Sequence, residues 1–148
     1  MRELLLKIKE VLQNSSNLSY IKDENIYIVD INDYIPDSAK FPLVTIKLGN
    51  ASNSQQLSQK YYQIVRVDIS LYQRPLKIGD SIINSQYGLL KIESDIIDTL
   101  IDNRLGICGI TNAFPVEQIN GREFSFNDDK DKIINRIITM EYNLFKKW

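Results

Sequence analysis

A strict alternation of apolar and polar side chains from Val65 to Leu71, within a strand predicted at residues 61–72, constrains the fold of this chain more than any other feature. The apolar positions are Val65, Val67, Ile69 and Leu71, and the polar positions between them are Arg66, Asp68 and Ser70. Successive side chains of a β-strand point to opposite faces of the sheet, so this period of two predicts a strand with one buried face. We expect the other face to meet water or a partner protein.

Two stretches repeat apolar residues every three or four positions, as one face of an α-helix does. The first stripe is Leu4, Leu5, Ile8, Val11 and Leu12. The second lies within residues 87–102 and is formed by Leu89, Ile92, Ile96 and Leu100. Glu93, Asp95 and Asp98 fall outside the second stripe. Both stretches are therefore predicted to be helices that lie on a sheet.

Further strands are predicted at residues 25–31, 41–48 and 133–145. The last strand has an apolar face, which Arg136 interrupts, and a polar face. The polar positions are Asn135, Thr139, Glu141 and Asn143. Residues 114–119 and 122–126 flank Asn120-Gly121, a dipeptide that favours the type I′ turn of a hairpin, so a hairpin is predicted there. Residues 73–80 and 127–132 are expected to form a loop and a charged turn.

These elements predict the α+β class, with a mostly antiparallel sheet packed against two α-helices. A mixed sheet is the alternative. The chain has 148 residues and an ordinary globular composition, so we expect residues 1–148 to form a single domain.

Residues 50–60, between the strand that Gly49 is expected to end and the strand at 61–72, are polar and almost uncharged. Hairpin connections usually contain about two to five residues. The segment is therefore predicted to be an unusually long loop, and loops of such length are often functional.

The residue inventory argues against catalysis and against most ligand sites. The chain has no histidine, which removes the commonest general base and most zinc sites. Cys108 is its single cysteine, and its sequence neighbours favour a small core residue over a reactive thiol. The acidic run at 127–131 lacks the glycine and the bidentate acid of a calcium loop. We expect no enzymatic activity, no metal and no cofactor.

Charge and hydropathy exclude two further classes of partner. A formal charge of -1 gives no clustered cations for neutralising phosphates, so sequence-specific binding of nucleic acid is not expected. No run approaches the roughly 20 apolar residues of a membrane span, and Lys7 and Lys9 interrupt the first apolar stretch. No membrane partner is therefore expected, and the composition favours a cytoplasmic protein.

The order of these elements and the residue patterns of their strands resemble the tail terminator, or tail completion, family of long-tailed bacteriophages and phage-tail-like particles. The resemblance spans nearly the whole chain and involves no catalytic motif. It is carried by the opening helix, the strand and glycine at 41–49, the polar segment, the strand at 65–72, the helix around 92–101, and the closing strand at 135–142.

The resemblance implies a ring, commonly hexameric, that caps the tail tube, ends its polymerisation and offers a surface for joining the head. The implied partners are other copies of the chain, the tail tube protein and a head-tail connector or neck protein, and DNA can pass through such a ring. The implied location is a virion or tail-like particle assembled in the host cytoplasm. The alternatives are another neck protein or a non-viral protein-binding module.

Exposed strand faces, long loops and a terminal aromatic residue are the expected contact elements of such a ring. The predicted protein-interaction residues are Asn50, Ser52, Asn53, Ser54, Gln55, Gln56, Leu57, Gln59, Lys60, Arg66, Asp68 and Trp148.

Overall fold

A computed structural model describes residues 2–31, 35–36, 40–57, 60–74, 88–107, 110–125 and 132–147. The elements within these ranges are α1 (Arg2–Asn14), two short 3-10 helices (Ser16–Leu18 and Asp23–Asn25), β1 (Ile26–Ile28), β2 (Leu43–Leu57), β3 (Lys60–Gln73), α3 (Leu89–Leu100), β4 (Ile110–Ser125) and β5 (Lys132–Lys147). The strands form one sheet in the order β1-β2-β3-β5-β4. β1 is parallel to β2, and every other neighbouring pair is antiparallel. The predicted α+β class is confirmed, with a mixed sheet.

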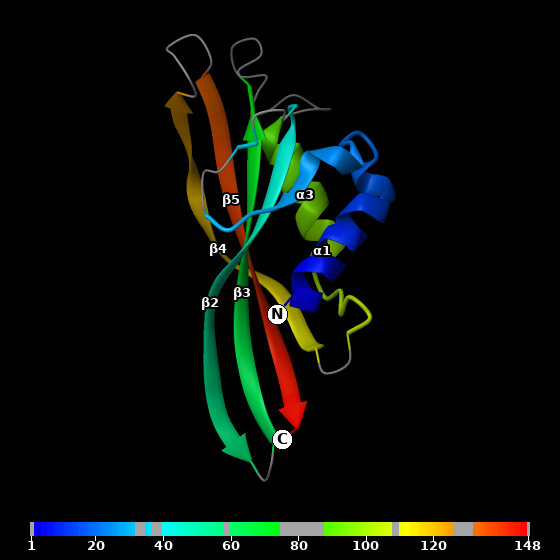
Figure 1. Ribbon diagram of the computed structural model, residues 1–148, viewed down its shortest axis with the longest axis vertical. Coiled ribbons are helices and arrows are strands. Elements are labelled where there is room, and N and C mark those ends of the chain that lie inside the picture. The colour runs from blue at the N-terminus through cyan, green and yellow to red at the C-terminus, as the bar shows by residue number, and fades with distance from the viewer. Residues whose placement is uncertain are drawn as a thin grey trace.

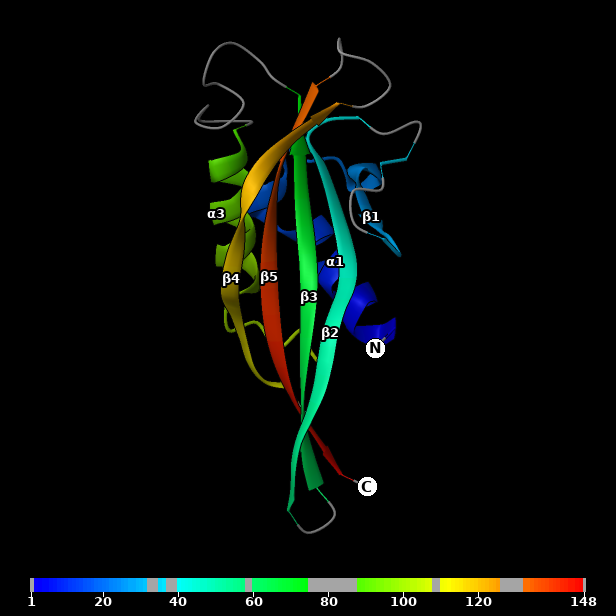
Figure 2. The same cartoon turned by 90° about the vertical axis from the view of Figure 1, so that its left-hand side faces the viewer.

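Helices α1 and α3 cover the same face of the sheet (Figures 1 and 2). Each helix buries residues spaced three or four apart, as its sequence predicts: Leu4, Ile8 and Leu12 on α1, and Leu89, Ile92, Ile96 and Leu100 on α3. Beneath them lie the predicted apolar faces of β3 and β5, among them Val65, Val67, Ile69, Leu71, Ile138, Met140, Tyr142 and Leu144. The main core therefore lies between the helices and the sheet.

A second, smaller cluster covers one end of the opposite sheet face. Its buried members are Ile35, Leu43, Tyr72 and Ile133, with Tyr27 and Phe41 packed against them. This cluster corrects the prediction that the whole second face of β3 meets water or a partner. Ser70 and Tyr72 are buried, whereas Arg66 is exposed and Asp68 is partly exposed. The helix-free face of β3 is therefore covered at the end that holds Ser70 and Tyr72 and accessible in the middle of the strand, at Arg66 and Asp68.

Residues 50–57 and 60 lie in strands and not in the predicted long loop. β2 continues through the segment to Leu57, and β3 begins at Lys60, so that Leu57 and Lys60 pair directly. The prediction was wrong because these residues lack the apolar alternation by which a strand is recognised in sequence. Backbone pairing with β3 determines their conformation instead.

The Asn120-Gly121 dipeptide does not form a hairpin turn. β4 is continuous around it, with Ile119 paired to Ile137 and Arg122 paired to Asn135. Two residues of β4 therefore face one residue of β5, which is a β-bulge, another setting in which glycine is favoured.

The bulges are confined to β2 and β4, the strands that flank the central pair. Register shifts occur twice in β2 and three times in β4, whereas β3 and β5 pair without interruption from Lys60–Lys147 to Gln73–Ile134. Because a bulge increases local twist, the outer strands coil around a regular central pair. Gly49 lies at a bulge within β2, so the prediction that it ends its strand was wrong.

Three smaller predictions also need correction. The strand expected at residues 25–31 is shorter, and Ile31 is 60% exposed beyond it. Gln73 belongs to β3 rather than to a loop. Glu93, which was predicted to lie outside the apolar stripe of its helix, is buried on α3. Residues 75–80, residues 127–131 and Cys108 lie outside the described part of the chain.

Arg136 interrupts the apolar face of β5 because it reaches α3. Its guanidinium Nε donates to a carboxylate oxygen of Glu93, and both side chains are mostly buried, with 23% and 10% of their surfaces exposed. A charge on each side of the interface is thus neutralised within the layer between helix and sheet.

Candidate interaction surface

The sheet extends past the helices as a narrow projection, visible at the lower end of Figure 1. We call this projection the arm and define it as residues 50–57 of β2, 60–64 of β3 and 143–147 of β5. Within it, β3 pairs with β2 on one side and with β5 on the other. The arm therefore consists of three hydrogen-bonded strands held to the body by the regular β3–β5 pair.

One edge of the arm has no neighbouring strand within the described ranges. β1 pairs with β2 only at residues 44–46, so β2 is paired on one side alone from Lys47 to Leu57. Such an edge presents backbone N–H and C=O groups that can pair with another chain. Proteins commonly protect edges with lysine or proline, yet residues 50–57 contain no charged residue and no proline. Apart from its bulges, this edge is chemically suited to strand pairing.

The arm begins at a bulge in which Gly49 lies against the backbone of β3. Leu48 pairs with Val67 and Ala51 pairs with Val65, so that Gly49 and Asn50 lie opposite the single residue Arg66. A Cβ atom at Gly49 would lie 2.9 Å from the backbone oxygen of Arg66, which is closer than real Cβ contacts. The close approach requires a residue without a side chain.

Replacement of Gly49 by alanine should destabilise the protein by about 1 to 3 kcal/mol, because the contacted atom is backbone and cannot move aside cheaply. Urea unfolding measures this as a lower midpoint. Gly106→Asn is the matched control at the other glycine whose surroundings are described: no atom lies within 4 Å of its Cβ position, and asparagine tolerates its φ of +68°. Equal midpoints for Gly49→Ala and the native protein would contradict the close approach.

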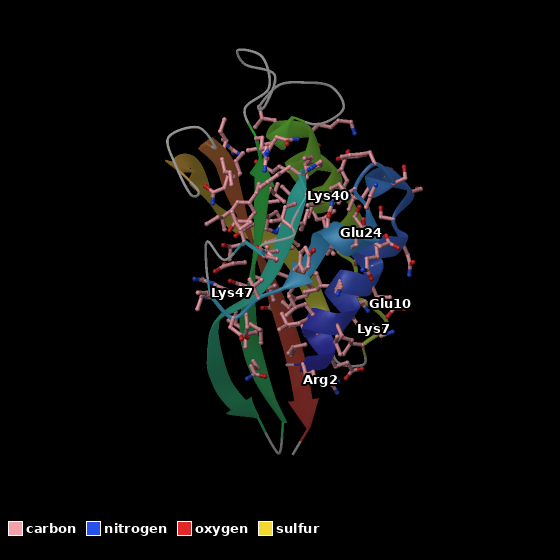
Figure 3. All side chains as sticks on the ribbon, turned by 45° about the horizontal axis from the view of Figure 1, so that its top comes forward. Arg2, Lys7, Glu10, Glu24, Lys40 and Lys47 are labelled. Carbon is pink, nitrogen blue, oxygen red and sulfur yellow. The ribbon has the colours of Figure 1, made fainter. Side chains whose placement is uncertain are left out.

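Polar side chains line the helix-free face next to the arm. Arg66 Nε donates to Glu141 Oε2 at 3.1 Å, and Thr139 Oγ1 donates to Asp68 Oδ1 at 2.9 Å. Lys47, which faces Asp68 in the strand register, donates from Nζ to the Leu48 carbonyl oxygen at 3.3 Å (Figure 3). These contacts join β2, β3 and β5 across the face. The Arg66 side chain is about half exposed, at 49%, and remains accessible to another protein.

The structure brings most of the predicted interaction residues together around the arm. Seven lie on β2: Asn50, Ser52, Asn53, Ser54, Gln55, Gln56 and Leu57. Three lie on β3: Lys60, Arg66 and Asp68. Gln59 and Trp148 are outside the described ranges. Sequence reasoning missed Thr139 and Glu141 as the partners of Asp68 and Arg66, although both were already placed on the polar face of the closing strand.

The described residues offer little other chemistry. No three of their histidine, cysteine, aspartate or glutamate side chains gather in a group that could hold a metal ion. None of the helices in the described ranges is both long and apolar enough to span a bilayer. Burial raises the pKa of the Tyr142 phenol in the main core, so that this group stays neutral beneath the helices.

Comparisons with known proteins find similarity in structure and none in sequence families. No protein-family model matches the sequence, and no curated protein matches it. Among solved structures, the chain is similar to one in the virion of a native gene transfer agent (GTA) particle, with a TM-score of 0.63 and 12% sequence identity. The similarity covers 97% of this chain and 95% of that chain. At this identity, the likeness demonstrates a shared fold over almost the full length of both proteins.

Proposed function

We propose that this protein is a non-enzymatic structural component of a phage-like virion or tail-like particle, assembled in the host cytoplasm. The observation that carries the proposal is the fold shared, over nearly its whole length, with a chain of a gene transfer agent virion. The resemblance to tail terminators in element order gives the finer proposal: a ring, commonly of six copies, that caps the tail tube and joins it to the head.

The arm and the two sides of the sheet supply the surfaces that such a ring needs. A ring subunit has two side interfaces, one surface against the tube and one against the head connector. The unpaired β2 edge suits strand addition, in which main-chain hydrogen bonds give affinity. The outer side of β4 likewise pairs with no described strand. We assign the arm to contact with the tube or the neighbouring subunit, and regard residues 1–148 as a single terminator-like domain.

Purified protein should bind one end of tail tubes and appear there as a ring in negative-stain images. Native mass spectrometry of the free protein should give a hexamer, or a monomer that assembles only on tubes. Tubes incubated without the protein are the control, and their ends should continue to grow when tube subunits are added. Binding to connector rings but not to tube ends would identify a neck protein instead. A monomer that binds neither would contradict both assignments and favour a separate binding module.

A further inference from the structure

A cavity of about 380 Å³ lies at the end of the sheet opposite the arm. Its lining comes from three separate segments, namely residues 20–25, residues 40–42 before β2, and Gln73 at the end of β3. They meet because β1 and β2 are parallel and begin at the same end, where antiparallel β3 finishes: Ile26 pairs with Val44, and Leu43 pairs with Tyr72. The volume is within the range of small-ligand sites.

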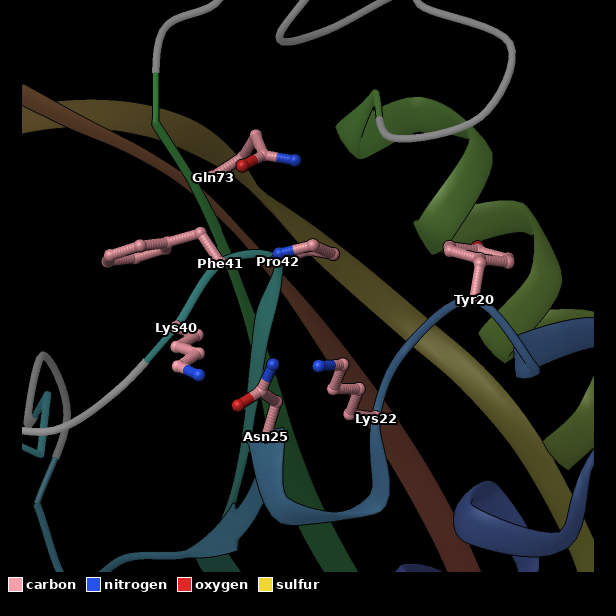
Figure 4. A pocket seen from close by; sticks show the side chains of 7 residues that line it. All are labelled: Tyr20, Lys22, Asn25, Lys40, Phe41, Pro42 and Gln73. Atoms are coloured by element: carbon pink, nitrogen blue, oxygen red, sulfur yellow. The ribbon is translucent and has the colours of Figure 1, made fainter.

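Positive charge and hydrogen-bond donors collect in this cavity. Lys22 and Lys40 both line it, and within the described ranges neither makes an ion pair. Their side chains lie on either side of the Asn25 amide in Figure 4. Asp23 and Glu24 are close in sequence but are not part of the lining. The cavity wall therefore carries two positive charges and no carboxylate among its described residues.

Asn25 is the most informative member of the lining. Asn25 is only 5% exposed, and its side-chain amide makes no hydrogen bond with a described group. Its backbone N–H donates to the Lys22 carbonyl oxygen at 2.8 Å. Its amide atoms are not among the fully buried polar atoms that lack a partner, so they are reached from the cavity. An amide that opens onto a cavity flanked by lysines can donate to an anion.

Two aromatic residues lie at opposite ends of the lining, and each contacts a cation (Figure 4). The Tyr20 hydroxyl donates to Asp95 Oδ2 at 2.8 Å, and Lys91 Nζ lies 4.5 Å from the centre of the Tyr20 ring. Burial raises the pKa of Tyr20, so its phenol adds no negative charge. On the other side, the Arg74 guanidinium lies 5.0 Å from the centre of the Phe41 ring and adds a third cation nearby. Pre-positioned walls reduce the entropy lost when a ligand binds.

From this arrangement we infer that the cavity is a docking site for an acidic peptide segment of a partner protein. A glutamate or aspartate carboxylate is held by Lys22, Lys40 and the Asn25 amide, and a neighbouring apolar side chain lies against Pro42. A nucleic-acid duplex does not fit, because it presents phosphates on a convex surface and needs an exposed row of cations rather than a recess. The inference does not depend on the ring proposal, since the cavity is at the other end of the molecule from the arm.

A peptide titration tests the site directly. The probe is acetyl-Gly-Glu-Phe-Glu-Gly-amide, and its control is the same peptide with glutamine in place of glutamate. Backbone and side-chain amide signals of the full chain are followed by NMR at low salt. We expect the Asn25 side-chain signals to shift, and the glutamate peptide to bind about five-fold more tightly than the glutamine peptide.

Three variants make the test specific to the cavity. Lys22→Met with Lys40→Met should weaken binding about ten-fold, whereas Arg2→Met with Lys9→Met, which removes the same charge from α1, should leave it unchanged. Asn25→Asp is nearly isosteric and introduces a carboxylate, so it should abolish binding in a folded protein. Equal affinity for the two peptides, or equal losses in both double variants, would overturn the inference. So would a shift of the Asn25 signals by inorganic phosphate or a DNA duplex as large as that caused by the glutamate peptide.

Discussion

On the proposed function, removal of the arm tip should produce a folded protein that fails to cap tail tubes. The change replaces residues 54–62 with Asn-Gly, so that a two-residue turn joins Asn53 to Gln63, which already pair across the hairpin. The deletion retains every residue of the two core clusters described above, so we expect a urea midpoint close to that of the native protein. The expected assembly result is loss of tube-end binding and a broad distribution of tube lengths in electron micrographs.

A variant with an arm of unchanged length tests whether the contact depends on the strand backbone or on the side chains of the arm. Ser54→Thr with Gln56→Thr keeps the hairpin length and favours a strand. If main-chain pairing along the β2 edge makes the contact, this variant should still cap tubes. Normal tube lengths with the shortened arm would refute the role assigned to the arm. Loss of capping by both variants would show that side-chain contacts carry the affinity.

Breaking the ion pair between α3 and β5 should give the largest loss of stability. Arg136→Met leaves the Glu93 carboxylate mostly buried without its partner, which costs about 3 to 5 kcal/mol in comparable sites. Chemical unfolding measures the loss. The double replacement Glu93→Leu with Arg136→Met removes both charges from the interface and should recover most of the stability, because the desolvation cost disappears together with the attraction.

An exposed pair on α1 provides the matched control for this cycle. Lys7 and Glu10 form a 2.9 Å ion pair, but their side chains are 40% and 55% exposed. Lys7→Met should therefore change the unfolding midpoint little. A destabilisation by Arg136→Met as small as that by Lys7→Met would contradict the structural importance given to the Glu93–Arg136 pair. A double variant no more stable than Arg136→Met alone would show that the pair is needed for packing geometry and not only for charge balance.

Hydrophobic periodicity predicted the parts of the fold that pack against one another. The alternation at Val65 and Val67 places β3 correctly, and the helical spacing of Ile92 and Ile96 places α3 correctly. These patterns are readable because burial on one face demands apolar residues at the period of the element. Arg136 looked like an irregularity, and its reason became visible only when Glu93, 43 positions away in sequence, was found to face it.

Features that depend on backbone pairing or on distant segments left no such pattern. Residues 50–57 of the arm contain few apolar side chains, so they show no apolar alternation and resembled a loop. Asn120-Gly121 is equally compatible with a turn and with a bulge, and the pairing partner β5 decides between them. The cavity around Asn25 combines residues from three segments, and nothing in their local sequences indicates that they meet.

The unequal distribution of bulges determines where this fold can gain or lose residues during evolution. A one-residue insertion within β3 or β5 would turn the following core side chains, such as Ile69 or Met140, outward, because the period of a strand is two. β2 and β4 already accommodate five such irregularities. Homologous chains should therefore align without gaps along the central pair and differ in length by single residues along the flanking strands. Such staggered offsets can erase a recognisable sequence relationship while the architecture persists.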